Sequence, residues 1–298
     1  MNKEIRNVEE IIRGIGYHWV GNGFKVNQLL PAAVYGRDMR RYSPFLLMDY
    51  NAPTIFPGTE DEVGVGAHPH RGFETVTFAF EGKVEHHDNR GNHGVIEPGD
   101  VQWMTAGAGI LHKEYHEKEY AKHDRSFHVL QLWVNLPIEH KMATPGYQAL
   151  EANQMGTATI GDDGKDGEAI VVAGEAFGAK GPAHTFTPMN IYRLKVAPGK
   201  TVTVQEPENY HLLMLTIYGT ATLNANETVK QGELAVFADE AGQVTITAGE
   251  EGAELIVLSG EPINEPIVAA GPFVMNTQAE IRQAEKDFYD GKFGTWNF

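Results

Sequence analysis

The chain has 298 residues, 42% of them hydrophobic and none of them cysteine, so it can bury two domain cores but has no disulfides and no thiolate metal sites. Its 40 acidic and 24 basic residues give a formal net charge of −16, which disfavours direct binding to the phosphate backbone of nucleic acids. No apolar run approaches the ~18 to 20 residues that span a bilayer, and the charged segment 1–13 lacks the apolar stretch of a secretory signal. We therefore expect a cytoplasmic protein that binds neither membranes nor nucleic acid directly.

Short runs of β-branched and aromatic residues, bounded by Gly, Pro, Asn and Asp, dominate the sequence. Turns such as Pro98-Gly99-Asp100 and Gln231-Gly232-Glu233 separate them. This pattern is typical of an all-β sandwich or barrel and not of alternating βαβ units. In chain order, the clearest predicted strands span residues 75–80, 101–105, 129–135, 190–196, 212–218, 235–238 and 254–258.

The segment just before the first of these strands contains His68 and His70. Side chains two residues apart in an extended segment point to the same side, and imidazole is the commonest protein ligand of transition metals. The pair therefore predicts a metal site, with two surface histidines flanking a proline as the alternative. Glu74 has two interpretations: a further ligand, or a structural carboxylate paired with Arg71 or another cation.

Three more polar residues follow at His86, His87 and Asp88. Adjacent residues of a strand face opposite ways, and the segment 88–92, Asp-Asn-Arg-Gly-Asn, is typical of a loop. We therefore expect a polar surface turn here. The alternative is a role for His86 or His87 at the entrance for a substrate.

His112 and Glu114 repeat the two-residue spacing. His112 and His116 also stand four residues apart, as in the helices of zinc peptidases, but those helices need a Glu directly after the first His, where this chain has Lys113. Two glycines just upstream disfavour a helix as well. An extended segment would therefore add one imidazole and one carboxylate to the first pair, giving three nitrogens and one oxygen for a single ion.

A polar, Gly-rich stretch at residues 143–166 marks the predicted domain boundary. Weakly repeated turns in the two halves suggest two copies of one β-barrel design. Eleven of the 13 histidines precede residue 150, and Gln205 and Pro207 stand where the second copy would align with His68 and His70. We predict a metal-binding domain at residues 1–150 and a second domain without metal ligands at residues 151–298.

Helical pattern is confined to the C-terminal part. Thr277, with Glu280 three residues later, forms the sequence signature of a capping box that leads into residues 281–289. We expect a short helix there, packed outside the β core.

Large apolar side chains of the first half are expected to fill a barrel interior, and some of them to line a pocket. A largely apolar pocket around a metal would suit a flat aromatic substrate. The sequence contains neither a phosphate-binding Gly-rich loop nor a Gly-x-Ser-x-Gly motif, which disfavours nucleotide binding and serine hydrolase activity. The apolar residues concerned are Phe78, Phe80, Trp103, Met104, Phe127, Leu132 and Trp133.

Four segments of the first half are similar to one known family; they are residues 68–77, 98–107, 109–114 and 130–137. Weaker similarity continues through residues 141–148, and near the C-terminus through 260–263 and 271–277. The family that these segments resemble is that of the pirins, which are bicupin proteins.

The resemblance implies two cupin-type β-barrel domains, of the double-stranded β-helix or jelly-roll kind, and one metal ion, usually iron. The residues that match the family's metal ligands are His68, His70, His112 and Glu114. This ligand set leaves Glu74 non-ligating. The donors alone do not select a metal, because Fe, Mn, Co, Ni, Cu and Zn all accept imidazole and carboxylate, so we expect one divalent ion, with Fe(II) favoured by the resemblance.

Some pirins resemble quercetin 2,3-dioxygenases, which open a flavonol ring with dioxygen and release carbon monoxide. The resemblance therefore implies an oxidoreductase that takes a flavonol-like aromatic substrate and dioxygen, with Glu114 accepting the proton of the flavonol hydroxyl. Other pirins are iron-containing partners of transcription factors. The alternative function is thus a non-enzymatic, iron-dependent and redox-sensing regulator of transcription or metabolism that binds a protein partner.

Overall fold

A computed structural model of the chain describes residues 4–296 and separates into two compact units. The histidine-rich unit comprises residues 15–40, 44–152 and the chain from 263 onward, and the second unit comprises the residues up to 14 together with 41–43 and 153–262. The division at 1–150 and 151–298 stays a prediction. The compact units differ from it because the segment up to residue 14 belongs to the second unit, and the segment from residue 263 onward belongs to the histidine-rich unit.

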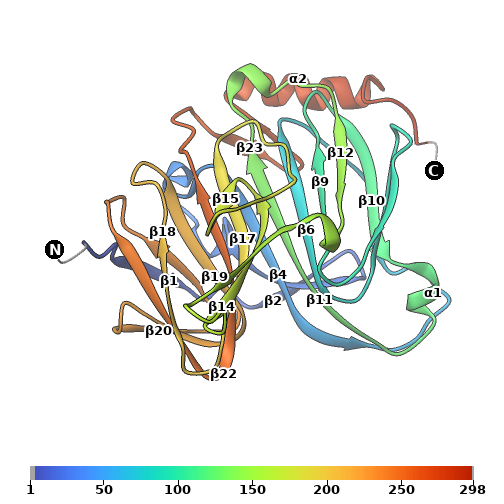
Figure 1. Cartoon of the computed structure of the whole chain (residues 1–298). Coiled ribbons are helices and arrows are strands. Elements are labelled where there is room, and N and C mark those ends of the chain that lie inside the picture. Colours follow the sequence, from blue (N-terminus) through green and yellow to red (C-terminus); the bar gives the residue numbers. More distant parts are fainter. Residues whose placement is uncertain (1–3, 297–298) are drawn as a thin grey trace. The chain divides into compact units, whose positions relative to one another are not determined.

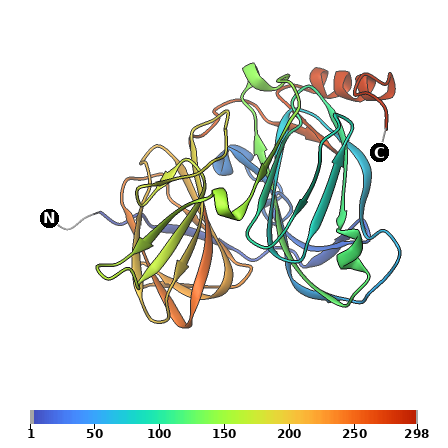
Figure 2. The ribbon, with the colours of Figure 1, turned by 45° about the vertical axis from the view of Figure 1, so that its right-hand side comes forward.

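The histidine-rich unit consists of a seven-stranded sheet in the order β12-β9-β6-β11-β4-β3-β2, a four-stranded sheet in the order β5-β10-β7-β8, and the hairpin β23-β24. In Figures 1 and 2 its strands curve around a common interior. A buried cluster that includes Phe24, Phe56 and Phe127 fills part of this interior. The strands are β2 (Tyr17–Val20), β3 (Phe24–Leu30), β4 (Phe45–Phe56), β5 (Gly64–His70), β6 (Phe73–Glu81), β7 (Val84–Asp88), β8 (His93–Ile96), β9 (Val101–Thr105), β10 (Ile110–His116), β11 (Arg125–Asn135), β12 (Gly146–Leu150), β23 (Val268–Ala270) and β24 (Phe273–Met275).

The second unit is built on a nine-stranded sheet with the path β1-β21-β19-β22-β17-β14-β13, in which β18 also pairs with β22 and β20 with β19. Alternating apolar residues such as Leu212, Met214 and Leu255 form its buried core. Its strands are β1 (Val8–Ile12), β13 (Gly156–Ile160), β14 (Gly167–Ala173), β15 (Glu175–Ala176), β16 (Ala179–Lys180), β17 (Met189–Val196), β18 (Thr201–Gln205), β19 (His211–Leu223), β20 (Glu227–Lys230), β21 (Leu234–Phe237) and β22 (Gln243–Gly260).

Helices are few within residues 4–296. The α-helices are α1 (Lys118–Ala121) and α2 (Gln278–Tyr289), and the short 3-10 turns are η1 (Ala32–Val34), η2 (Met39–Tyr42), η3 (Ile138–His140) and η4 (Ala152–Gln154). None of the described helices is long and apolar enough to cross a membrane.

The predicted all-β fold is confirmed, and each predicted strand coincides with or overlaps an observed one. The predicted C-terminal helix is also confirmed: the Thr277 hydroxyl accepts a hydrogen bond from the backbone N–H of Glu280 at the start of α2. The Glu280 carboxylate returns to the backbone N–H of Asn276, one residue earlier than in the usual capping box.

The surface turn predicted at residues 86–88 is wrong. These residues form the end of strand β7, which pairs with β10 on one side and β8 on the other, and the side chains of His86 and Asp88 are buried. The loop-like composition of residues 88–92 belongs to the turn that follows the strand, and that turn folds back onto Asp88.

Candidate metal centre

Strands β5 and β10 bring the predicted histidine ligands together. The two strands are antiparallel neighbours, and His112 stands directly opposite His68. His70 lies two residues after His68 and therefore on the same side of β5. A shift in strand register separates His112 from Glu114, which stands opposite Val65.

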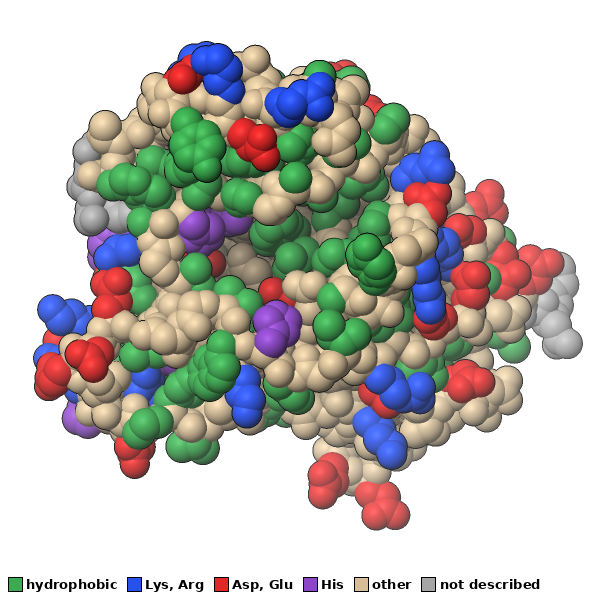
Figure 3. Space-filling model, turned by 180° about the vertical axis from the view of Figure 1, so that it is seen from behind, with side chains coloured by type: hydrophobic (Ala, Val, Ile, Leu, Met, Phe, Trp, Pro, Cys, Tyr) green, Lys and Arg blue, Asp and Glu red, His purple; other side chains and the backbone are tan. Residues whose placement is uncertain are grey.

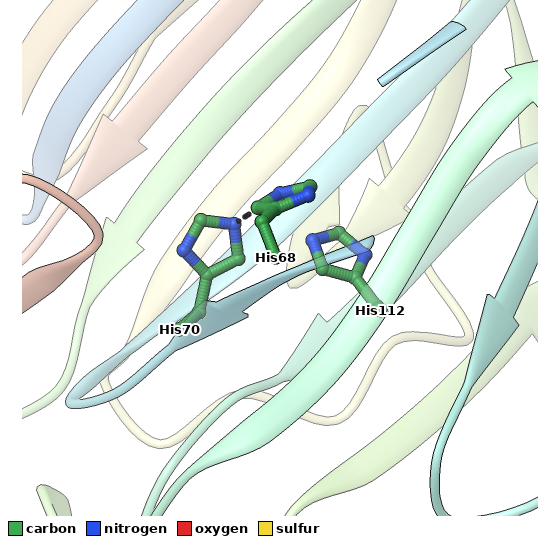
Figure 4. Close-up of side chains that lie close together, drawn as sticks. All are labelled: His68, His70 and His112. Atoms are coloured by element: carbon green, nitrogen blue, oxygen red, sulfur yellow. Dashed lines mark hydrogen bonds between the residues drawn. The ribbon is translucent and has the colours of Figure 1, made fainter. Parts of the chain in front are cut away.

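The three imidazoles point toward one another (Figure 4). The Nε2 atoms of His68 and His70 are 3.0 Å apart, and the ring of His112 lies 4.3 Å from that of His68 and 4.9 Å from that of His70 between centroids. One ring nitrogen from each residue can be chosen so that all three lie within 4.8 Å of one another. This is the arrangement of a trio of ligands around one small cation.

The backbone fixes the tautomers of the first two histidines. The Nδ1 atom of His68 lies 2.8 Å from the carbonyl oxygen of Gly66, and that of His70 lies 3.3 Å from the carbonyl oxygen of Pro272. A carbonyl oxygen only accepts, so each Nδ1 must donate a proton. Burial lowers the pKa of both histidines, which keeps them neutral. The two Nε2 atoms therefore face each other with lone pairs and no proton between them. A cation bound between them would remove the repulsion of these lone pairs.

A relay of two side chains fixes the tautomer of His112. The Oδ2 atom of Asp88 lies 3.2 Å from Nε2 of His86, and Nδ1 of His86 lies 3.5 Å from Nδ1 of His112. Burial by itself would raise the pKa of Asp88, but hydrogen bonds, first of all from His86, lower it, so Asp88 is an ionised acceptor. His86 thus donates to Asp88 and accepts from His112.

This relay leaves Nε2 of His112 with a lone pair. The atom is buried, and no described residue forms a hydrogen bond with it. A buried polar atom without a partner costs free energy, and a bound cation would supply the missing partner. The donor chemistry of the site therefore fits a transition metal.

Glu114 lies beside this trio but is not part of it. Its Oε1 atom accepts hydrogen bonds from Nε2 of Gln102 and, at 3.1 Å, from the Thr77 hydroxyl. Its carboxylate clusters with His86 and His112, and not with all three predicted histidine ligands at once. Burial raises the pKa of Glu114, which suits a group that takes up a proton. The four-residue ligand set stays a prediction.

A cavity of about 290 Å³ opens onto the site and is lined by His68, His70 and Glu114. Figure 3 shows a recess bordered by hydrophobic side chains, with histidines near its opening. Trp133, one of the predicted core or pocket residues, lies in this wall, and its ring is 5.2 Å from that of His70. The other lining residues are Val20, Phe24, Val26, Leu47, Asp49, Val65, Val129, Gln131, Gly271 and Pro272.

Two polar side chains in this wall escaped the sequence analysis. Asp49 and Gln131 stand opposite each other on the paired strands β4 and β11. Burial raises the pKa of Asp49 to about 6, and Gln28 donates a hydrogen bond of 2.8 Å to its Oδ1. No local motif marks either residue, because their proximity arises only from the pairing of strands that are distant in sequence.

Among the described residues, Glu74 forms no hydrogen bond or ion pair with Arg71 or with the three predicted histidine ligands. It is buried, accepts a hydrogen bond of 2.7 Å from the Thr105 hydroxyl, and does not line the cavity. Arg71 pairs instead with Asp287 of α2 at 2.9 Å. Arg71 is therefore not the partner of Glu74, which was one of the alternatives offered for this carboxylate.

The chain matches two family models, "Pirin" over residues 23–134 and "Pirin C-terminal cupin domain" over residues 191–294. It is 41% identical over 276 residues to a protein of Pseudomonas aeruginosa named "Putative quercetin 2,3-dioxygenase", covering 93% of this chain and 94% of that protein. It is 36% identical over 265 residues to human pirin, covering 86% of this chain and 85% of that protein.

A crystal structure of quercetin 2,3-dioxygenase from Acinetobacter baumannii superposes with a TM-score of 0.92 and 42% sequence identity, covering 98% of this chain and 99% of that chain. These similarities extend over both units of the fold. The chain therefore belongs to the pirin family of two-domain cupin proteins.

Proposed function

We propose that this protein is a metal-dependent dioxygenase that opens a flavonol such as quercetin with dioxygen and releases carbon monoxide. The observation that carries the proposal is the contact between the unprotonated Nε2 atoms of His68 and His70, with the unpartnered Nε2 of His112 beside them. The cavity next to these atoms and the names of the similar proteins support the substrate class. The ion in this proposal is Fe(II), held by His68, His70 and His112 with Glu114 as the fourth ligand.

A divalent ion bound at this position would act as a Lewis acid toward the flavonol hydroxyl and would exchange electrons with dioxygen. Glu114 is placed to take the proton of that hydroxyl. Gln102 and Thr77 both donate hydrogen bonds to its Oε1. Because burial raises its pKa, the carboxylate holds a proton more readily than an exposed glutamate does.

The cavity wall would orient the substrate and exclude water. Its apolar side chains, with Trp133 packed beside His70, suit a flat aromatic ring system. Asp49 and Gln131 are the polar groups of the wall outside the metal site, and they are suited to hydrogen bonds with ring hydroxyls. The metal, the positioned base and the apolar wall together match the needs of ring opening in a site that is protected from water.

The metal centre is tested by His70→Ala, with His123→Ala as the control because His123 is exposed and belongs to none of the candidate metal-binding clusters of the described residues. We expect elemental analysis to find one equivalent of metal less in His70→Ala than in the parent and the control, while circular dichroism shows all three to be folded. A metal content in folded His70→Ala equal to that of the parent would contradict the centre.

Catalysis is tested with the iron-loaded protein and quercetin. Anaerobic mixing should shift the quercetin absorption, and admission of oxygen should bleach it and release one carbon monoxide per quercetin. If neither step changes the spectrum of a fully loaded sample, the dioxygenase proposal is wrong. The iron-dependent regulator then becomes the favoured function, and partner binding should differ between the Fe(II) and Fe(III) forms.

A further inference from the structure

We propose a second transition-metal site, separate from the cavity, formed by Glu85, His87 and His93 on the outer side of strands β7 and β8. Glu85 and His87 lie two residues apart on β7 and so share one side of the strand. His93 on β8 stands directly opposite His87. The site takes Zn(II), or another metal of similar ligand preference such as Ni(II), Co(II) or Cu(II).

The three side chains converge on one point. The Oε1 atom of Glu85 lies 3.0 Å from Nε2 of His87 and 2.9 Å from Nε2 of His93. The two imidazole rings are 4.2 Å apart between centroids and inclined by 33°. One ligand atom from each residue lies within 4.8 Å of the other two.

The two oxygen-to-nitrogen separations are close to those of a tetrahedral metal site. Bonds of about 2.0–2.1 Å to zinc place neighbouring ligand atoms about 3.3 Å apart in a regular tetrahedron. The carboxylate oxygen and the two nitrogens therefore need to move by only a few tenths of an ångström along those contacts. Strand pairing between β7 and β8 holds the backbone of all three residues, so the ligands are positioned before an ion binds.

The charge and the donor types fit a borderline transition metal. Glu85 supplies a carboxylate oxygen that accepts hydrogen bonds from both imidazoles, so it already faces the nitrogens with which it would share an ion. Two imidazoles and one carboxylate are a common trio for zinc, and they disfavour magnesium and calcium, which prefer oxygen ligands alone. Water would complete the coordination.

An ion can reach this cluster from solvent. The side chain of His93 is 54% exposed and that of His87 is 26% exposed. Each imidazole now donates through Nε2 to Glu85, and a metal that binds there would displace that proton. None of the three residues lines the cavity of the first site.

The two sites lie on opposite sides of β7. His86 and Asp88 point inward to the relay that holds His112, while the alternating residues Glu85 and His87 point the other way. The ring of His87 stacks on Tyr115, inclined by 17° at 5.7 Å between centroids. The outer site is thus a separate cation site built on the strands that also carry the inner one, and it does not depend on the proposed dioxygenase activity.

The test counts bound metal in the full chain. Protein stripped with a chelator is titrated with Zn(II) by calorimetry, and the stoichiometry is read by native mass spectrometry. We expect two equivalents for the parent and one for each of Glu85→Gln and His93→Ala, with affinity for the outer equivalent reduced about 100-fold or more. Glu85→Gln removes the charge but keeps an oxygen that can accept from the imidazoles, so the variant should still fold without metal, as circular dichroism can check.

Two further variants separate the sites. His70→Ala should keep the outer equivalent and lose the inner one, and the exposed-residue control His123→Ala should keep both. Loaded with Co(II), His70→Ala should show the visible absorption of tetrahedral cobalt, and the double variant with His93→Ala should not. The proposal is overturned if Glu85→Gln and His93→Ala bind as many equivalents as the parent, or if His123→Ala loses as much zinc as they do.

Discussion

His112 shows how a single proton decides whether a histidine can bind a metal. An imidazole offers a lone pair on only one of its two nitrogens when neutral, and the hydrogen bond at the other nitrogen selects which. Here the chain from Asp88 through His86 places the proton on Nδ1 of His112. For His68 and His70 backbone carbonyls make the same selection. The three free nitrogens of the trio are thus set by neighbours that are not ligands themselves.

The relay predicts that His86→Ala weakens metal binding at the inner site although His86 lies outside the histidine trio. Without His86, the Nδ1 proton of His112 loses its acceptor, and the ring can adopt the tautomer in which Nε2 is protonated. We expect the affinity of the equivalent that His70→Ala abolishes to fall about 10- to 100-fold, measured by competition with a chromophoric chelator.

His87→Ala provides the matched control for this measurement. It removes the neighbouring imidazole from the same strand but on the opposite side, so the affinity of the inner equivalent should equal that of the parent. The relay has no role in metal binding if His86→Ala binds that equivalent as tightly as His87→Ala does.

At the scale of elements, the C-terminal segment holds the turn that follows His70. Arg71 donates to the carbonyl oxygen of Ala108 at 2.7 Å, pairs with Asp287 of α2 at 2.9 Å and lies over the ring of Phe293 at 4.5 Å. The Lys141 ammonium donates to the carbonyl oxygens of Gly72 at 2.8 Å and Val274 at 3.0 Å. Together with the contact between Pro272 and His70, these bonds make residues 272–287 part of the support of the proposed metal site.

Asp287→Ala should therefore destabilise the histidine-rich unit. The side chain of Arg71 is only 6% exposed, and loss of its carboxylate partner would leave a buried guanidinium without a counter-charge. Hydrogen bonds from Lys292 and Arg71 hold the pKa of Asp287 well below its usual range, so the pair is ionised. We expect the free energy of unfolding, measured by urea denaturation, to fall by about 3 kcal/mol.

Lys286→Ala is the control on the same helix. Lys286 is exposed and pairs with Asp290 one turn later, so its loss should change the free energy of unfolding by no more than about 0.5 kcal/mol. Equal losses in the two variants would mean that the ion pair of Arg71 does not anchor α2.

The elements show which features could be predicted from the sequence. The pattern of β-branched and aromatic residues predicted both ends of β9 correctly. The two-residue spacings predicted that His68, His70 and His112 lie in extended segments, and the structure brings these strands together. Strand β7 was missed because the loop-like composition of residues 88–92, which follow the strand, led to the prediction of a turn at residues 86–88 as well. The two-residue spacing of His86 and Asp88 carried the same signal as that of His68 and His70.

Contacts between distant segments could not be predicted. Arg71 and Asp287 are 216 positions apart, and Asp49 meets Gln131 only because β4 pairs with β11. Residues in such pairs have ordinary surroundings in the sequence. Their roles follow from strand pairing and helix docking, which a single sequence does not encode in any local pattern.

At the scale of the whole molecule, a net charge of −16 draws divalent cations toward the surface, and every histidine of the inner trio belongs to one compact unit. An ion that binds only the folded form stabilises that form by RT ln(1 + [L]/Kd), about 2.7 kcal/mol when the ion is present at 100 times its Kd. At the proposed inner site the ion would contact β5 and β10, the strands that carry His68, His70 and His112, so the stabilisation should be strongest there.

Metal removal should therefore change the protection of backbone amides in a restricted set of segments. With iron or zinc bound, hydrogen exchange should slow in β5, β7 and β10, and in residues 268–287, which contact His70 through Pro272 and the neighbouring Arg71 through Asp287. Peptides from β19 and β22 of the second unit serve as the internal reference, because none of the proposed ligands belongs to them. Comparison of metal-loaded and chelator-treated protein by mass spectrometry gives the result. An equal gain of protection in β19 and β22 would contradict a stabilisation confined to the unit that supplies the ligands, and unchanged exchange in β5 and β10 would contradict binding at the histidine trio itself.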